Sequence, residues 1–475
     1  MPELDPNCSL TARVDFATSP SVASTPANNE AAARKASPIL MLIGSVNANP
    51  RNARKHSKKQ VSKVAASVRE FGFVNPVVLD ENNVVLVGHC RLAAAKLLGL
   101  EAIPAIRLDY LTEEQKRAYM LADNRLAEDA IWDLEKLAIE LKELSDIKLD
   151  FAIESTGFET VEIDRILEKD EVARLSGSEA IPEPDHQQPP ISRLGDLWQL
   201  GEHRLLCADA TKEDNYVRLM GDDRAQMVIT DLPYNLCISS IVGSGSIQHP
   251  EFPMASGEMT SEEFTRFLRG VFERLVRFSI DGSIHYLFMD WRHDLELRLA
   301  AEGVYREFKN LVIWNKPNAG LGTFYRSKHE LIFVFKNGTA AHLNNFGLGG
   351  DGRYRTNVWD YPGVNIRRPG GHTDLEMHPT AKPVAMIMDA IKDCSRGKGI
   401  IIDPFSGSGT TIIACQRTRR IARTMELDPA YVDLAVRRWE ATSGKVALHA
   451  ESGLSLDELA GTRGVPSPHY AFERR

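Results

Sequence analysis

The sequence predicts an α/β protein whose larger part is a mostly parallel sheet with helices on both faces, joined to a smaller α/β module. Two observations carry this prediction. In the second half of the chain, short apolar runs of strand length alternate with helical patterns, and a compact strand–turn–helix pattern comes before them. A length of 475 residues and a hydrophobic content of 43% leave room for two or three domains, each with its own core.

The overall composition narrows the class of protein. A net charge of −8 and a sequence pI near 6.0 mean that the net charge of the protein does not attract nucleic acid, so any such contact has to use local basic patches. The six cysteines are scattered without zinc-ligand spacing, which indicates reduced thiols and no metal site. No apolar run approaches the roughly 18 residues that a membrane helix needs. We therefore expect a cytoplasmic protein with no membrane partner.

Residues 1–38 and 39–150 differ in character. The first segment is rich in Ala, Ser, Pro, Thr and Asn without periodicity, which indicates a disordered arm. In the second segment, an apolar face at helical spacing precedes two strands that flank a polar turn. The residues concerned are Val61, Val64, Val68 and Phe71 in the helix, and Pro76–Leu79 and Val84–Val87 in the strands. Thr112 and Gln115 then form a capping box for a further helix.

The run Val85–Gly99 predicts a strand, a glycine turn and a helix that ends at glycine. It resembles the ParB/sulfiredoxin-like nuclease superfamily, whose Gly-(His/Glu)-x-Arg turn places an arginine and a helix start against nucleotide phosphates. The resemblance covers roughly residues 39–150 and implies that Gly88, His89 and Arg91 bind a nucleotide or a phosphate. Cys90 is interpreted as a packing residue rather than a redox catalyst. No helix-turn-helix is evident after this module.

Residues 151–190 are expected to form a helical segment and a Pro-rich linker, because four prolines between Ser176 and Pro190 exclude regular hydrogen-bond ladders. The second domain is expected over 191–445, followed by a tail over 446–475. Its strands are expected at Gln226–Thr230, Ile284–Met289, Leu311–Trp314, Leu331–Phe335, Ile400–Asp403 and Ile421–Glu426, with a covering helix at Glu262–Phe278.

Two motifs follow expected strands of this domain. Ile400–Thr411 runs from an apolar strand into an acidic residue and a glycine-rich turn, where a ligand can approach the backbone before a helix begins at Gly409. Upstream, Thr230–Asn235 contains Asp-Leu-Pro-Tyr. The pair resembles the amino-group DNA methyltransferases, whose cofactor motif reads Asp-Pro-Phe-x-Gly-x-Gly-Thr and whose catalytic motif reads Asp-Pro-Pro-Tyr. The catalytic motif comes first here, as is typical of the family's β-type members, and the resemblance implies a Rossmann-like methyltransferase fold.

The resemblance implies S-adenosylmethionine as the cofactor. The turn lacks Gly-Lys-Ser/Thr, which counts against an NTPase, and Glu426 is a carboxylate about 20 residues after the glycine turn, where it suits ribose hydroxyls. By resemblance, Asp403 lies near the methionine part, Phe405 and Asp209 lie near the adenine, and the segment His378–Pro383 closes the pocket. The expected cofactor-binding residues are Asp403, Pro404, Phe405, Gly407, Gly409, Thr410, Glu426, Asp428, Lys382 and Asp209.

The catalytic residues that the resemblance implies are Asp231, Leu232, Pro233 and Tyr234. An exocyclic amino nitrogen is a poor nucleophile because its lone pair is delocalised into the ring. The carboxylate of Asp231 and the carbonyl of Leu232 would accept both amino hydrogens and localise that lone pair for in-line attack, while Tyr234 would stack on the flipped base. Leu232 departs from the family pattern, since it keeps the carbonyl but lacks the proline ring that stiffens it.

The expected partner is double-stranded DNA, and Asp with Tyr in the catalytic motif favours adenine N6 as the target. Cytosine N4 is the alternative. Target recognition is expected in Leu236–Met259 and Asn337–Leu375. The basic residues in or beside these insertions are Arg326, Lys328, Arg353, Arg355, Arg367 and Arg368.

Three further alternatives stay open. A homodimer is compatible with the sequence. The chain can also be a nucleotide-responsive ParB-like DNA-binding regulator with a degenerate methyltransferase domain, or it can use the same pocket to methylate RNA.

Overall fold

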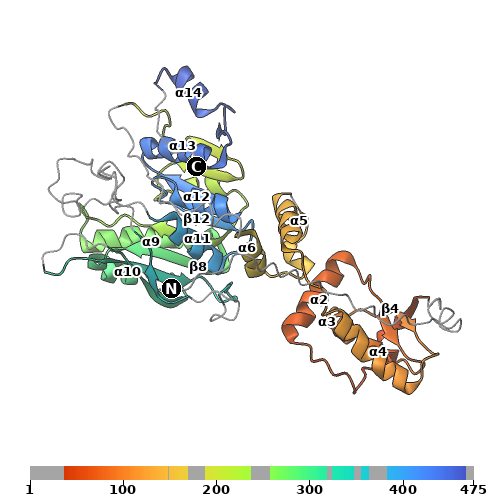
Figure 1. Ribbon diagram of the computed structural model, residues 1–475. Coiled ribbons are helices and arrows are strands. Elements are labelled where there is room, and N and C mark those ends of the chain that lie inside the picture. Colours follow the sequence, from red (N-terminus) through yellow and green to blue (C-terminus); the bar gives the residue numbers. More distant parts are fainter. Residues whose placement is uncertain are drawn as a thin grey trace, which may run out of the picture. The chain divides into compact units, whose positions relative to one another are not determined.

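The computed structural model describes residues 37–147, 149–168, 188–236, 257–317, 324–346, 355–362 and 382–466. Their contacts divide the chain into two compact units, with the division between Ile131 and Trp132 (Figure 1). The limits expected from the sequence, at 150 and 191, stay predictions. The expected arm and most of the Pro-rich linker lie outside the described residues, as do large parts of the two expected recognition insertions with Arg353, Arg367 and Arg368.

The first unit is a small sheet in the order β1-β4-β2-β3, packed against helices. The strands are β1 (Ile39–Leu42), β2 (Val77–Leu79), β3 (Val85–Val87) and β4 (Ala102–Arg107), and the helices are α2 (Lys58–Phe71), α3 (His89–Leu97) and α4 (Glu113–Leu126). Both expected strands and all three expected helices are present. The capping box of Thr112 and Gln115 starts α4, as predicted. Val77, Leu79 and Ile103 lie at the centre of the core.

The second unit is built on one mixed sheet in the order β11-β9-β10-β8-β7-β12-β13-β6-β5-β14. Its strands are β5 (Leu197–Leu200), β6 (His203–Cys207), β7 (Ala225–Asp231), β8 (Ser279–Met289), β9 (Glu307–Asn315), β10 (His329–Lys336), β11 (Val358–Asp360), β12 (Ile400–Asp403), β13 (Ile421–Glu426) and β14 (Leu448–His449). The central strands β8, β7, β12, β13 and β6 are parallel to one another. The strands expected from the sequence are all found in this sheet.

Helices cover both faces of this sheet, which confirms the expected fold class (Figure 1). The helices α11 (Val384–Cys394), α12 (Thr410–Thr418) and α13 (Pro429–Ser443) contribute to one core, and α7 (Glu213–Met220), α9 (Ser261–Arg277) and α10 (Asp294–Ala301) contribute to the other. Side chains alternate between the two cores along a strand, so that Met227 and Ile229 of β7 enter the first and Val228 enters the second. A short helix, α14 (Leu456–Arg463), follows β14.

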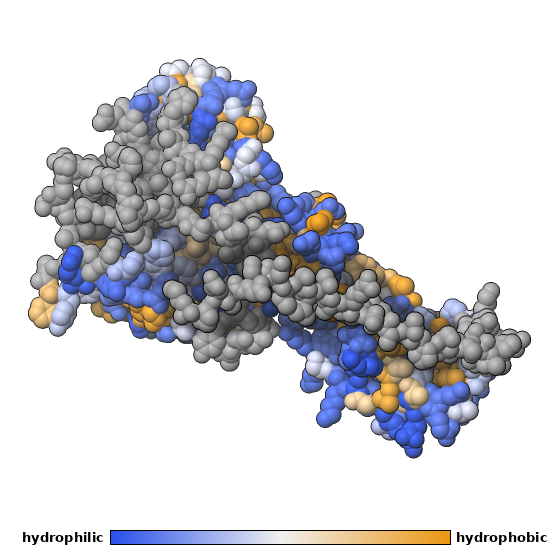
Figure 2. All heavy atoms as spheres, in the orientation of Figure 1, coloured by the Kyte–Doolittle hydropathy of each residue, from blue (hydrophilic) through white to orange (hydrophobic). Residues whose placement is uncertain are grey.

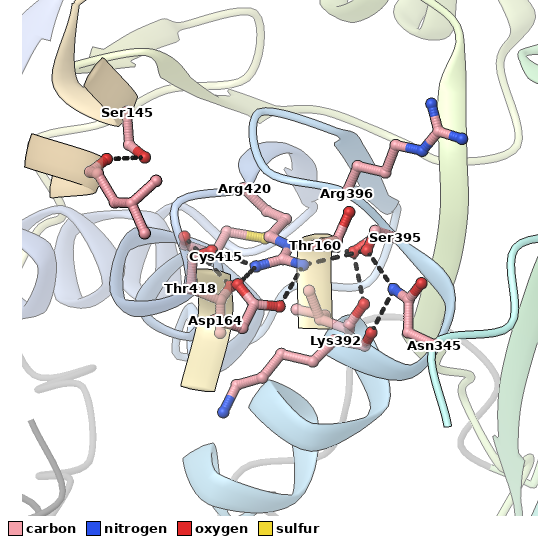
Figure 3. A network of polar contacts seen from close by, with 12 residues as sticks. Ser145, Thr160, Asp164, Asn345, Lys392, Ser395, Arg396, Cys415, Thr418 and Arg420 are labelled. Carbon is pink, nitrogen blue, oxygen red and sulfur yellow. Dashed lines mark hydrogen bonds and ion pairs between the residues drawn. The ribbon is translucent and has the colours of Figure 1, made fainter. Parts of the chain in front are cut away.

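A helical pair precedes the sheet within the second unit. The helices α5 (Leu134–Asp146) and α6 (Thr160–Glu168) share a small apolar core with Leu137, Leu141 and Ile163. Figure 3 shows how α6 is attached to the sheet domain: the guanidinium of Arg420 donates to both carboxylate oxygens of Asp164, at 2.8 and 3.0 Å. Arg420 is completely buried, and it also donates to the carbonyls of Ser395 and Thr418. An internal ion pair therefore fixes α6 to the connection between α12 and β13.

On the face shown in Figure 2, the described residues are predominantly hydrophilic, with smaller apolar areas, and the mean hydropathy of the whole chain is −0.25. Among the described residues, no helix is long and apolar enough to cross a membrane. Two exposed aromatic residues, Phe324 and Tyr325, lie between β9 and β10.

Candidate active site

The sheet order brings the two sequence motifs together. β7 and β12 are parallel, hydrogen-bonded neighbours, with Met227 opposite Ile401 and Val228 opposite Ile402. Their carboxyl ends therefore open at the same edge of the sheet, where ligands bind in open α/β folds. A cavity of about 480 Å³, including the space at its open side, lies at this edge. It is lined by Ile229, Thr230, Asp231, Phe288, Lys382, Ile387, Asp403, Phe405, Ser406, Gly407, Ser408, Thr410 and Thr411.

Glycine is required in the turn after β12. Gly407 and Gly409 have φ values of +50° and +81°, in the left-handed region that residues with a side chain rarely adopt. A Cβ atom on Gly409 would lie 2.9 Å from the Cβ of Ala435 in α13, too close for a packed contact. The backbone of the turn therefore packs closely against α13, and the turn leads directly into α12 at Thr410.

Asp403 is locked in place at the end of β12. The hydroxyls of Thr230 and Thr411 donate to its two carboxylate oxygens at 2.7 and 2.6 Å, and the amide of Phe405 donates at 3.1 Å. Burial raises the pKa of Asp403 to about 6, against the effect of these hydrogen bonds. Pro404 continues the turn, and Phe405 lines the cavity, with its ring centroid 6.4 Å from that of Phe267 in α9.

Glu426, at the end of β13, holds the glycine turn. The amides of Gly407 and Asp428 donate to its two carboxylate oxygens at 2.7 and 2.9 Å, and burial raises its pKa to about 7. Asp428 itself caps α13 by accepting from the amide of Ala430. Asp209 follows β6, which is the strand next to β13. The amide of the preceding residue, Ala208, donates to the carbonyl of Glu426, so Asp209 lies beside the end of β13. The two acidic residues expected to hold the adenosine part thus lie at adjacent strand ends.

Asp231 belongs to a partly buried group of four charged residues, which we call the four-charge cluster: Asp231, Lys382, Glu330 and Lys316. The ammonium of Lys382 contacts the Oδ2 atom of Asp231 and lies 3.2 Å from the Oε2 atom of Glu330. Lys316 contacts the other oxygen of Glu330. Two carboxylates and two ammonium groups balance each other at the edge of the cavity.

Burial raises the pKa of Asp231, while the ammonium of Lys382 lowers it and the neighbouring Glu330 raises it. For Glu330, Lys382 and Lys316 prevail over burial and lower the pKa. The two carboxylates raise the pKa of Lys382 despite its burial, so the ammonium stays charged.

The rest of the Asp-Leu-Pro-Tyr motif is tightly packed. The hydroxyl of Tyr234 donates to the Oδ1 atom of Asp231 at 2.6 Å. The side chain of Leu232 is 2% exposed and belongs to the core that contains α9, and Pro233 follows it in the chain. Asn235, with a φ of +51°, holds the chain near Met259 by donating to its carbonyl at 2.9 Å. The motif is therefore fixed at both of its ends.

Several residues of the site are not among those expected from the sequence: Glu330, Lys316, Thr230 and Thr411. Glu330 had a sequence signal, since it is an acidic residue inside the apolar strand His329–Lys336, where a buried carboxylate needs a partner. Of the segment expected to close the pocket, Lys382 and Pro383 are described, and His378–Ala381 lie outside the described residues. Arg355, which lies in one of the expected recognition insertions, donates to Asp393 and to the hydroxyl of Tyr361, and its expected role near DNA stays a prediction.

In the first unit, the glycine turn has the geometry that its residues predict. Gly88 has a φ of +102° and precedes the first residue of α3, His89, whose ring accepts from the amide of Asn49 at 3.2 Å. Arg91 donates from one guanidinium nitrogen to the carbonyls of Asn75 and Pro76, both at 2.8 Å. The arginine therefore fixes the entry to β2, whatever else it binds.

Within the described part of the chain, no group of three or more His, Cys, Asp or Glu side chains is arranged to hold a metal ion. Burial raises the pKa of the Cys90 thiol, which disfavours the thiolate that a redox catalyst needs.

Three families of known proteins match successive parts of the chain. A family described as DNA methylase matches residues 225–437, the ParB N-terminal domain matches 29–125, and the ParB-methyltransferase HTH domain matches 135–194. The last match corrects the expectation that no helix-turn-helix follows the first module. Its signal is weak in the sequence because residues 147–159 separate α5 from α6, in place of a turn of three or four residues.

Individual relatives cover the same parts. The ParB-like nuclease domain-containing protein YnaK of Escherichia coli (strain K12) is 44% identical over 66 residues, which cover 14% of this chain and 76% of YnaK. The Type II methyltransferase M.HpaI of Haemophilus parainfluenzae is 23% identical over 261 residues, which cover 50% of this chain and 75% of M.HpaI. The crystal structure of an M1.HpyAVI–SAM complex matches with 20% identity and a TM-score of 0.36, and covers 49% of this chain and 97% of that one.

Proposed function

Because the chain belongs to the N6/N4 DNA methylases and carries a ParB-type N-terminal domain, we propose that it transfers a methyl group from S-adenosylmethionine to the N6 amino group of adenine in a specific duplex sequence. The observation that carries the proposal is the shared cavity. Asp231 and the glycine turn that begins at Asp403 line the same space, although they lie far apart in the chain.

The residues of the cavity fit the cofactor. A ligand with a sugar needs carboxylates for its hydroxyls, and a ligand with an aromatic base needs an apolar wall. Phe405 lines the cavity and can supply that wall, whereas Glu426 is not a lining residue and accepts from the amide of Gly407, which is one. We propose that Glu426 accepts the ribose hydroxyls from this position beside the cavity. Gly407 and Ser408 of the turn line the cavity, while the close packing of Gly409 against Ala435 fixes the turn on α13. When bound, S-adenosylmethionine supplies an electrophilic methyl group.

The chain's own residues prepare the nucleophile. The carboxylate of Asp231 accepts one hydrogen of the target amino group, and the carbonyl of Leu232 accepts the other, which directs the nitrogen lone pair out of conjugation with the ring. The buried side chain of Leu232 anchors this peptide in place of the proline ring found in relatives of the common pattern. Tyr234 stacks on the extruded base. Cytosine N4 is the alternative target, since the same acceptors suit either amino group.

Contact with the duplex is proposed at the loop between β9 and β10, which leaves the sheet at the same edge as Asp231 because β10 runs antiparallel to β8 and β9 runs antiparallel to β10. Phe324 and Tyr325 are exposed there, and Arg326 and Lys328 follow them. Exposed aromatic rings can stack on unpaired bases, and the neighbouring basic side chains can contact the phosphates of the opened duplex.

The test combines labelled cofactor with DNA of varied sequence and identifies the modified nucleoside by mass. Wild-type protein is expected to label DNA and yield N6-methyladenine; N4-methylcytosine would shift the assignment to the alternative target. Asp231→Ala is expected to abolish transfer and to retain cofactor binding, because Asp231 is expected to act on the base. Asp222→Ala, an exposed carboxylate outside the cavity, serves as the matched control. Full activity of Asp231→Ala would remove this residue from the mechanism.

For the first domain we propose a nucleotide or phosphate at Gly88, His89 and Arg91, where the start of α3 and a guanidinium lie together. Binding of nucleoside triphosphates to wild type and to Arg91→Ala tests this. Nucleotide binding that disappears in Arg91→Ala, with no methyl transfer to DNA or RNA by wild type, would favour the regulator with a degenerate methyltransferase domain.

A further inference from the structure

Asp231 is already engaged by two donors. Its Oδ2 atom contacts the ammonium of Lys382, and its Oδ1 atom accepts the hydroxyl of Tyr234 at 2.6 Å. A carboxylate that is to polarise an amino group works best when its negative charge is not neutralised at contact distance. Lys382 therefore makes Asp231 a weaker acceptor for the target amino group, unless a second carboxylate can accept the ammonium.

Glu330 provides that place. Its Oε2 atom lies 3.2 Å from the nitrogen of Lys382 and 3.4 Å from the hydroxyl of Tyr234, so both donors of Asp231 already reach it. Lys382 and Glu330 are 6% and 14% exposed, so an ammonium that left Asp231 without reaching another carboxylate would remain a buried, uncompensated charge, which is strongly unfavourable. Glu330 is thus within reach as a second acceptor for the same proton donors.

We propose that Glu330 is a positioning residue that takes over Lys382 when the amino group of the target base reaches Asp231. The proposal rests on the function proposed above and adds a role that the sequence motifs do not include. Lys316 holds the other oxygen of Glu330, so that the Glu330 carboxylate stays in place while its Oε2 atom receives the ammonium. The total charge of the four-charge cluster does not change, since one ammonium moves its contact between two carboxylates and no proton is transferred.

The test measures methyl transfer by Glu330→Gln, by Glu330→Asp and by the double variant Glu330→Gln with Lys382→Met. Glu330→Gln leaves Lys382 with Asp231 as its one anionic partner in the cluster, so kcat is expected to fall about 10- to 100-fold, as for the loss of a hydrogen bond to a charged group, with the KM for cofactor unchanged. The double variant removes the ammonium and is expected to be faster than Glu330→Gln alone. Glu330→Asp keeps a carboxylate and is expected to be intermediate. Glu307→Gln is the matched control, because Glu307 is an exposed carboxylate on the neighbouring strand, paired with Lys309.

A second measurement needs no turnover. Binding of a target duplex is compared with binding of the same duplex carrying a purine without the 6-amino group at the target position. Wild type is expected to prefer the amino-bearing base, and Glu330→Gln is expected to lose that preference, because Asp231 remains bound to Lys382. A purely structural role for Glu330 would weaken both duplexes equally.

The outcomes separate the two proposals. Wild-type kcat in Glu330→Gln, or a double variant that binds cofactor normally and is no faster than Glu330→Gln, would overturn the role of Glu330 and leave the methyltransferase function standing. A wild-type protein that methylates no nucleic acid would overturn the function and, with it, this role. If Glu330→Gln also loses cofactor binding, Glu330→Asp decides: an intermediate kcat with normal cofactor affinity supports the role, and a wild-type kcat refutes it.

Discussion

Removing the carboxylate of Asp164 is expected to loosen the attachment of α6 and to lower the stability of the second unit by about 3–5 kcal/mol. The reason is that Arg420 is completely buried and loses the carboxylate that neutralises it, which is the costly way to break a buried ion pair. The carbonyls of Ser395 and Thr418 still accept from the guanidinium, so the lower part of that range is the better expectation. At about 2 °C for each kcal/mol in a domain of this size, the melting temperature of Asp164→Ala should fall by about 6 °C or more.

The assay is calorimetric unfolding of wild type and Asp164→Ala, with hydrogen exchange of the α6 amides to locate the change. Glu451→Ala is the control, because Glu451 pairs with Arg218 at an exposed position of the same unit and should change stability by no more than about 1 kcal/mol. Replacing both partners, as Asp164→Leu with Arg420→Met, should recover part of the loss, since no buried charge then remains. Equal melting temperatures for Asp164→Ala and Glu451→Ala, with unchanged exchange in α6, would refute the reasoning.

Two further changes test the cofactor side of the cavity. Affinity for S-adenosylmethionine, measured by calorimetric titration, should rise about tenfold between pH 6 and pH 8, because burial raises the pKa of Glu426 to about 7 and the ionised form is the one proposed to accept the ribose hydroxyls. Glu426→Gln should bind more weakly and show a flat profile through this range, and an unchanged profile would assign the titration to another group. Gly409→Ala should lower the melting temperature and abolish cofactor binding because its Cβ meets Ala435 at 2.9 Å, whereas Gly397→Ala, with nothing within 4 Å of the added atom, should leave both properties near those of wild type.

Much of this architecture could be predicted from local sequence patterns. The strands that end at Asp231, Asp403 and Glu426 are apolar runs bounded by acidic or turn residues, and this signal depends only on neighbouring residues. Their adjacency in the sheet could be inferred from a resemblance to a known family. The placement of the motifs around one cavity follows from that adjacency.

The partners of these residues could not be predicted in the same way. Lys316 directly follows β9 and Glu330 lies in β10, on the far side of β8 from Asp231. Their pairing depends on antiparallel register that the residues themselves do not encode. Asp164 lies in a helical pattern and Arg420 directly precedes a strand pattern, and each alone resembles an ordinary surface charge. Side-chain pairs between distant elements become visible only once the chain is folded.

The bonds around Glu426 have a thermodynamic consequence. Because the amides of Gly407 and Asp428 hold both oxygens of its carboxylate, the side chain has given up its rotational freedom during folding rather than during association. A sugar that docks there meets a receptor whose shape is already set, so little ordering entropy is lost at this contact. The ribose contact should then form with little conformational change, and the larger rearrangements should occur on the side of the cavity that binds the nucleobase.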